Sequence, residues 1–149
     1  MDVQININGV EGILKALENL PVATQKKILR PGLRKGANII KKQASENVKS
    51  VVSDEATGFL SRNIVVRSLR ARNKGDVRIA VAIRPGEVGN PRTGTRVGLY
   101  GSVLEYGKEG QPPRPWLRPA QRDKAQEAIN ALVATGQQKF NDMVNEAKR

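Results

Sequence analysis

Apolar residues recur with a helical period in three stretches of the chain. Over residues 10–20 they recur every three or four positions, which predicts a short amphipathic helix. The same spacing over residues 22–49 and 118–147 predicts two long amphipathic helices. Pro21 lies between the first two stretches, where a proline ends one helix or occupies the first turn of the next.

Two positions within the long helices bear on their shape. Pro31 lacks a backbone donor and its ring clashes with the preceding turn, so we expect a kink or break near Arg30. Without a break, a helix over residues 22–49 would span about 42 Å and would either bend around the body or protrude from it. Gly136 lies on the apolar stripe of the last helix, where it permits close packing at a cost of about 1 kcal/mol relative to Ala.

Alternation with a period of two predicts strands in two places. Residues 2–8 form a short half-buried strand with Val3, Ile5 and Ile7 on one face. Residues 62–84 form a hairpin with a tight turn at Asn73-Lys74-Gly75. Its second strand alternates cleanly and places four apolar side chains on one face: Val77, Ile79, Val81 and Ile83.

The region after the hairpin has no such regularity at first. Residues 85–95 combine glycine and proline without periodicity, which predicts an exposed loop. Leu99, Val103 and Tyr106 then recur at helical spacing and predict a helical turn. The predicted fold class is α+β, with a small antiparallel sheet built on the hairpin and the long amphipathic helices packed on one of its faces. We expect one domain over residues 1–149.

Charge is the strongest compositional signal. Lys and Arg number 26 and Asp and Glu 14, giving a net charge of +12, and most of that excess lies within residues 21–84. Such a field favours polyanions or acidic protein surfaces as neighbours. The basic residues form either solvated faces or contacts to DNA phosphates or acidic subunits. The candidates are Lys26, Lys27, Arg30, Arg34, Lys35, Lys41, Lys42, Arg67, Arg78 and Arg84.

The composition lacks most of the residue types that enzymes use for catalysis. The sequence contains no His and no Cys, so it lacks histidine-based triads, thiol nucleophiles and the commonest ligands of transition metals. Its carboxylates are scattered, and no phosphate-binding glycine loop is present. We therefore expect no catalysis, no metal and no cofactor. We also expect no membrane span and no signal peptide, and the absence of Cys fits synthesis in a reducing cytoplasm.

The stretch from Leu104 to Ala120 holds four of the eight prolines and the only Trp. Each proline fixes φ and biases the residue before it toward extended conformations, which predicts a stiff strap. Trp116 and Leu117 are the candidate anchors of this strap to the body. Glu105 is the one carboxylate in the largely apolar run of residues 97–106, and Arg118 or Arg114 could pair with it. The plainer interpretation is a proline-rich connector that closes a hydrophobic core.

This stretch resembles the sequence pattern of tail-completion proteins, the head–tail joining or neck proteins of long-tailed bacteriophages related to lambda. The matching residues are Tyr100, Glu105, Tyr106, Gly107, Pro115, Trp116, Leu117, Arg118, Pro119 and Ala120. Two positions depart from the family pattern: Lys108 stands where a small hydroxyl residue is usual, and Trp116 where Phe is usual.

The resemblance implies a virion structural protein of the neck, made in the host cytoplasm, that joins tail to head around the DNA channel. It implies self-assembly into a ring, with six copies favoured over twelve, and contacts with neighbouring connector and tail-tube proteins and with genomic DNA. The matching strap residues, Tyr100 to Pro119, then become candidate interface residues. The alternative is a basic protein that binds nucleic acid non-specifically through phosphates, although the sequence has no recognised nucleic-acid-binding motif.

Overall fold

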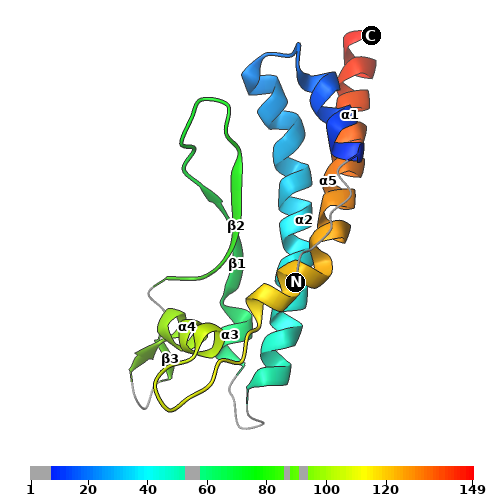
Figure 1. Ribbon diagram of the computed structural model, residues 1–149. Helices are drawn as coiled ribbons and strands as arrows, with labels where there is room; N and C mark the ends of the chain where they lie inside the picture. The colour runs from blue at the N-terminus through cyan, green and yellow to red at the C-terminus, as the bar shows by residue number, and fades with distance from the viewer. Residues whose placement is uncertain (1–7, 53–57, 86–87, 91–93) are drawn as a thin grey trace.

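The computed structural model describes residues 8–52, 58–85, 88–90 and 94–149 (Figure 1). In chain order, the helices and strands of these residues are α1 (Asn8–Leu17), α2 (Val22–Val51), α3 (Phe59–Arg62), β1 (Ile64–Leu69), β2 (Arg78–Ile83), β3 (Val88–Asn90), β4 (Thr95–Arg96), α4 (Val97–Tyr106) and α5 (Leu117–Ala147). The fold is α+β, as predicted, with the β1–β2 hairpin lying against the long helices.

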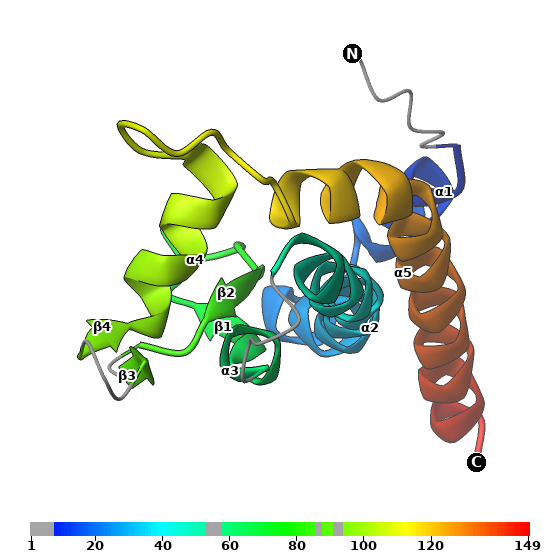
Figure 2. The ribbon, with the colours of Figure 1, turned by 90° about the horizontal axis from the view of Figure 1, so that it is seen from below.

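The helices α2 and α5 lie side by side and run in opposite directions (Figure 1). Two glycines of α2 make this contact close. A Cβ atom at Gly32 would lie 2.8 Å from the carbonyl oxygen of Leu132, and one at Gly36 would lie 2.7 Å from that of Ala128. The backbones therefore meet directly at these points. Viewed from below, α5 curves around α2, while α4 lies on the opposite side (Figure 2).

Of the kink or break predicted near Arg30, the break does not occur, since α2 is continuous from Val22 to Val51. A proline inside a helix removes one hydrogen bond and crowds the preceding turn. Here Ile28 and Gly32, on either side of the proline, are both buried. Packing of this part of α2 against α1 and α5 therefore offsets the lost bond. The close packing predicted at Gly136 is present, since a Cβ there would lie 2.9 Å from Ile13 Cδ1.

The predicted hairpin forms between β1 and β2, with Ile64 opposite Ile83 and Leu69 opposite Arg78. Its turn is wider than the predicted one, because the paired residues end at Leu69 and Arg78. The Asp76 carboxylate closes this turn by accepting hydrogen bonds from the backbone N–H groups of Arg72 and Asn73. Turn residues that bond one another in this way make a longer connection stable.

The region of residues 85–95, predicted as a loop without regular structure, contains the antiparallel pair β3–β4. The register shifts between Val88 and Asn90, and such an irregular pair gives no period-two pattern in the sequence. The predicted helical turn after it is the complete helix α4. The strand predicted over residues 2–8 lies outside the described residues except for Asn8, which begins α1.

Buried apolar side chains form two clusters rather than one continuous core. The first lies where the end of α2 meets α3, β1, α4 and the start of α5, and includes Val48, Ile64, Leu104 and Trp116. The second lies where α1 packs on α2 and α5, and is built on Ile13, Leu17 and Ile28. Trp116, at the end of the strap, belongs to the first cluster, so this residue anchors the strap to the core.

Candidate functional site

Because α4 and α5 take in the two ends of the predicted strap, the strap proper is residues 107–116, and it begins with a turn that requires glycine. Gly107 has φ +77°, and a Cβ there would lie 2.9 Å from the carbonyl oxygen of Gln111. Lys108 and Gln111 exchange two backbone hydrogen bonds of 3.0 and 2.9 Å. Gly110, at φ +74°, supplies the left-handed residue of that turn. The strap therefore starts as a tight, internally bonded loop directly after α4.

Arg114 fastens the middle of the strap to two helices. Its backbone N–H donates to the carbonyl of Leu104 in α4 at 2.7 Å. Its guanidinium Nη1 donates to the carbonyl of Val51 at the end of α2, at 3.3 Å. The sequence predicted Arg114 as a possible partner of Glu105, but its contacts are to backbone carbonyls, and Arg118 is the partner.

Trp116 lies in the core at only 2% exposure. Its indole Nε1 donates to the carbonyl of Gly101 at 2.9 Å, and its own carbonyl accepts from the Asn47 amide at 3.0 Å. Buried tryptophans need such a partner for the indole N–H. The ring is therefore packed between α4 and α2 and offers no surface to another molecule.

Glu105 caps the first turn of α5 from outside that helix. Its carboxylate accepts hydrogen bonds from the backbone N–H groups of Trp116, Leu117 and Arg118, at 2.7, 2.8 and 3.1 Å. These are donors that the start of a helix leaves without a partner, and a negative charge there is favoured by the helix dipole. One buried side chain of α4 thus satisfies three backbone groups where the strap enters α5.

Arg118 completes this arrangement. Its Nε donates to Glu105 Oε1 at 2.8 Å, and its Nη2 donates to the Glu105 backbone carbonyl at 2.7 Å. Burial alone would raise the pKa of Glu105, but the hydrogen bonds from Leu117, Trp116 and Arg118 outweigh it and hold the pKa below its usual value. The Arg118 guanidinium also lies 5.1 Å from the centre of the Tyr106 ring. Glu105, Trp116, Arg114 and Arg118, here called the clamp, therefore lock α4, the strap and α5 together.

The clamp holds the outer face of α4 toward solvent. Leu99 is 61% exposed and Tyr106 70% exposed, and residues seven apart lie on the same side of a helix. Tyr100, the residue after Leu99 in α4, is also exposed, and so is Pro115 on the strap. Leu117 and Pro119 are half-buried at the start of α5. Of the predicted interface residues, Tyr100, Tyr106, Pro115 and Arg118 are thus the ones the fold leaves most accessible.

Two contributions to this region were not predicted from the sequence. Asn47 reaches the strap from α2, and no local pattern marks an asparagine for a partner so distant in the chain. Leu99 was predicted only as part of a helical turn. Gly101 lies on the side of α4 that faces the core, since a Cβ there would lie 3.4 Å from the Trp116 ring. Leu99, two residues earlier in the helix, therefore points away from the core.

The candidate basic residues do not gather on one face. Lys27, Arg30, Arg34 and Lys41 recur at three, four and seven along α2 and form one row, from which Arg34 donates to Ser68 of β1 at 3.2 Å. Lys35 and Lys42 lie seven apart and form a separate row on α2. Arg67 and Arg78 share the outer face of the hairpin, since Arg67 is opposite Ala80. Lys26, four residues before Arg30, borders the first row, and Arg84 follows β2 outside these groups.

The described residues offer neither a cluster of metal ligands nor a membrane-spanning helix. They contain no group of three or more acidic side chains that could hold a metal ion. Within the same residues, no helix has the length and apolar character needed to cross a membrane.

Comparison with known proteins identifies a family. A family model described as “Bacteriophage HK97-gp10, putative tail-component” matches residues 11–107, more than half of the chain. The match begins within α1, at Glu11, runs through α4 and ends at Gly107. Searches of curated proteins and of solved structures return no match for this chain.

Proposed function

This chain belongs to the HK97-gp10-like family of bacteriophage tail components, and on that basis we propose that it is a neck subunit that joins the phage tail to the head. The observation that carries the proposal further is the outer face of α4. Leu99 and Tyr106 are exposed apolar side chains on a helix that the clamp holds rigidly. Exposed apolar groups on a fixed support are what a protein–protein contact requires.

The proposed mechanism is assembly rather than turnover, with no cofactor. A ring forms when two different patches on each subunit meet and the rotation between subunits closes. We propose that the outer face of α4 is one of these patches, and that six copies form the ring. Because the clamp fixes α4, the strap and α5 before subunits meet, little conformational freedom is lost on association.

In this assembly the basic residues face acidic neighbours or the DNA that passes through the neck. Each copy brings a net charge of +12, and a ring of copies concentrates that charge. Like charges brought together repel, so an assembled ring needs anionic partners. The two rows on α2 and the Arg67–Arg78 pair on the hairpin are the candidate contacts. Their distribution over several faces suits a subunit that has different neighbours on different sides.

The second candidate function is binding of nucleic acid by the isolated protein through phosphates. The observation that supports it is the row of basic side chains on α2, in which Arg34 also donates a hydrogen bond to Ser68 of β1. The row consists of Lys27, Arg30, Arg34 and Lys41. Salt dependence separates the two functions. A protein that uses six or more phosphate contacts loses roughly 10³-fold or more in affinity between 50 and 200 mM salt. A neck subunit that meets DNA only within the assembled particle retains DNA weakly as a free protein at either salt concentration.

Electron microscopy of lysates from a phage that lacks this gene tests the primary proposal. The expected result is DNA-filled heads and tails that remain unjoined, with joined particles restored when the gene is supplied separately. Normal joined particles in the absence of the gene would contradict a role at the head–tail junction and favour DNA binding.

A further inference from the structure

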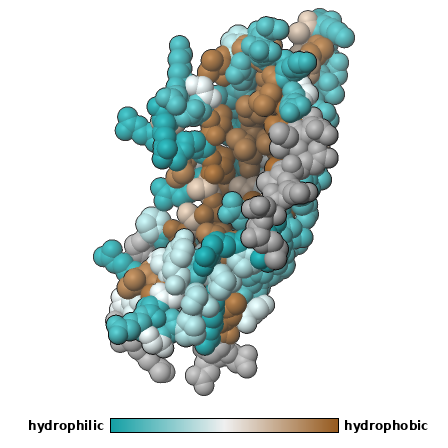
Figure 3. All heavy atoms as spheres, in the orientation of Figure 1, coloured by the Kyte–Doolittle hydropathy of each residue, from teal (hydrophilic) through white to brown (hydrophobic). Residues whose placement is uncertain are grey.

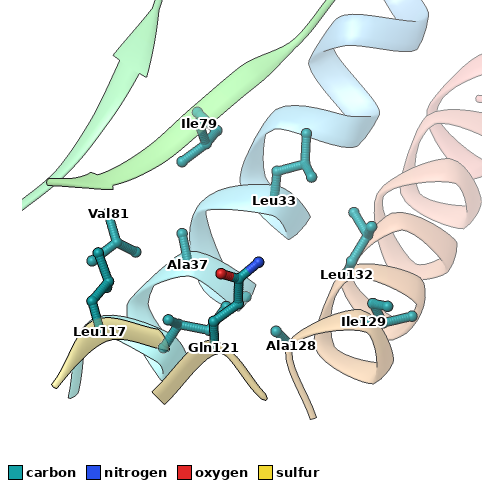
Figure 4. A pocket seen from close by; sticks show the side chains of 11 residues that line it. Leu33, Ala37, Ile79, Val81, Leu117, Gln121, Ala128, Ile129 and Leu132 are labelled. Carbon is teal, nitrogen blue, oxygen red and sulfur yellow. The ribbon is translucent and has the colours of Figure 1, made fainter. Parts of the chain in front are cut away.

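An apolar groove runs between the two core clusters and faces solvent. Its floor is α2, with Leu33 and Ala37, and its walls are β2 on one side and α5 on the other (Figure 4). Ile79 and Val81 line the β2 wall, and the α5 wall includes Leu132. The hollow has a volume of about 330 Å³. The space-filling view shows it as an apolar band between the polar hairpin and the helices (Figure 3).

The β2 strand leaves this groove open on one edge. Among the described residues, β2 pairs with β1 alone. Its other edge therefore presents backbone N–H and C=O groups that no described strand pairs with. An unpaired edge beside an apolar trough is a template for one further strand. A strand there would need apolar side chains at alternate positions, because one face would lie on α2 and the other would meet solvent.

The residues before Asn8 meet this requirement by their sequence. Val3, Ile5 and Ile7 alternate with polar residues, the same pattern that β2 shows with Ile79, Val81 and Ile83. We propose that this N-terminal segment, residues 2–7, docks in the groove of its own chain as a third strand along the free edge of β2. The proposal is independent of the function proposed above.

The position and direction of α1 support docking within one chain. A Cβ at Gly9 would lie 3.1 Å from Val133, and one at Gly136 would lie 2.9 Å from Ile13. The helix α1 therefore starts beside Val133 and runs along α5 in the same direction. A segment that enters α1 at Asn8 thus arrives from the side of Leu132 and the residues before it, which form the wall of the groove.

The length of the segment also matches the groove. Six extended residues span about 20 Å. The part of α5 that borders the groove, from Leu117 to Leu132, is about 22 Å long at 1.5 Å per residue. A strand running beside this part of α5, in the same direction, would be antiparallel to β2, since β2 and α5 run in opposite directions (Figure 1). The resulting sheet would be antiparallel throughout, and the three apolar side chains would join the two core clusters.

Matched substitutions test the alternation on which the proposal rests. Ile5→Asp places a charge on the face directed at α2, and Asn6→Asp places the same charge on the opposite face. Hydrogen exchange of the β2 amides is expected to become about tenfold faster in Ile5→Asp and to stay unchanged in Asn6→Asp. Equal β2 exchange in both variants and in the wild type would overturn the proposal.

Cross-linking identifies the occupant even if Ile5→Asp fails to fold. Because the sequence contains no Cys, a short bis-maleimide reacts only with introduced thiols. The pair Ile5→Cys and Ile79→Cys is expected to link within one chain, whereas the control pair Ile5→Cys and Leu99→Cys, with its second thiol on α4, is expected to stay unlinked. Links between two chains would overturn docking within one chain and assign the groove to a second copy. Absence of any link, or equal linking in the control, would overturn the proposal outright.

Discussion

Glu105 and Arg118 are joined by two hydrogen bonds that run in one direction. Arg118 donates through Nε to the Glu105 carboxylate at 2.8 Å and through Nη2 to the Glu105 backbone carbonyl at 2.7 Å. Because the same carboxylate accepts three backbone N–H groups at the start of α5, the pair fixes that helix to α4. The clamp therefore makes the outer face of α4 a rigid surface.

Replacing the Glu105 carboxylate with an amide tests the strength of this connection. In Glu105→Gln the amide NH₂ group would point at N–H donors, and the charge that favours the helix N-terminus would be lost. We expect the free energy of unfolding to fall by about 2–3 kcal/mol, measured by urea denaturation. The exposed Glu109→Gln is the control and should change it by less than about 0.5 kcal/mol. Equal effects in the two variants would contradict the role assigned to Glu105.

The lowered pKa of Glu105 predicts a dependence of stability on pH. Between the lowered folded-state value and the usual value near 4.5, the unfolded chain binds more protons at this position than the folded chain does. The contribution of Glu105 is therefore complete above its usual pKa and is lost as the pH falls through the lowered one.

This dependence is measured as the difference in unfolding free energy between the wild type and Glu105→Gln over a range of pH. The difference should be constant near neutral pH and should shrink on acidification below the usual pKa of Glu105. A difference that stays the same at low pH would show that the carboxylate is not stabilised in its charged form.

Gly36 is predicted to be intolerant of any side chain. A Cβ there would lie 2.7 Å from the backbone carbonyl oxygen of Ala128, which cannot move without displacing α5. Gly36→Ala should lower the free energy of unfolding by about 1–3 kcal/mol. In α1, a Cβ at Gly12 would meet nothing within 4 Å, so Gly12→Ala should instead stabilise by up to about 1 kcal/mol. Thermal unfolding of both variants distinguishes them, and a stabilised Gly36→Ala would refute close packing of α2 on α5.

Periodicity in the sequence predicted the helices, the hairpin and the α+β class, because those features depend on neighbours close in the chain. Of the kink or break predicted near Arg30, the break does not occur, because contacts of Ile28 and Gly32 with distant helices outweigh a local preference. The pair β3–β4 was missed, since a short and irregular pair leaves no alternation to detect.

The candidate site was predicted in part. Proline spacing indicated the strap, and the isolated carboxylate indicated Glu105 with an arginine partner. The three backbone donors that Glu105 accepts from could not be predicted, because they depend on where α5 begins relative to α4. The burial of Trp116 against Gly101 likewise depends on the packing of two segments that sequence spacing does not relate.

The central claim is that the outer face of α4 is an assembly surface carried on a structural clamp. It is tested by supplying variants to a phage that lacks the gene and counting joined particles by electron microscopy. The double variant Leu99→Ser and Tyr106→Ser removes two exposed apolar side chains, and Leu14→Ser, at 54% exposure on α1, is the matched control. Both proteins are expected to unfold at nearly the wild-type temperature. The account predicts that Leu14→Ser restores joined particles and that the α4 variant leaves heads and tails separate. Wild-type numbers of joined particles from the folded α4 variant would contradict it.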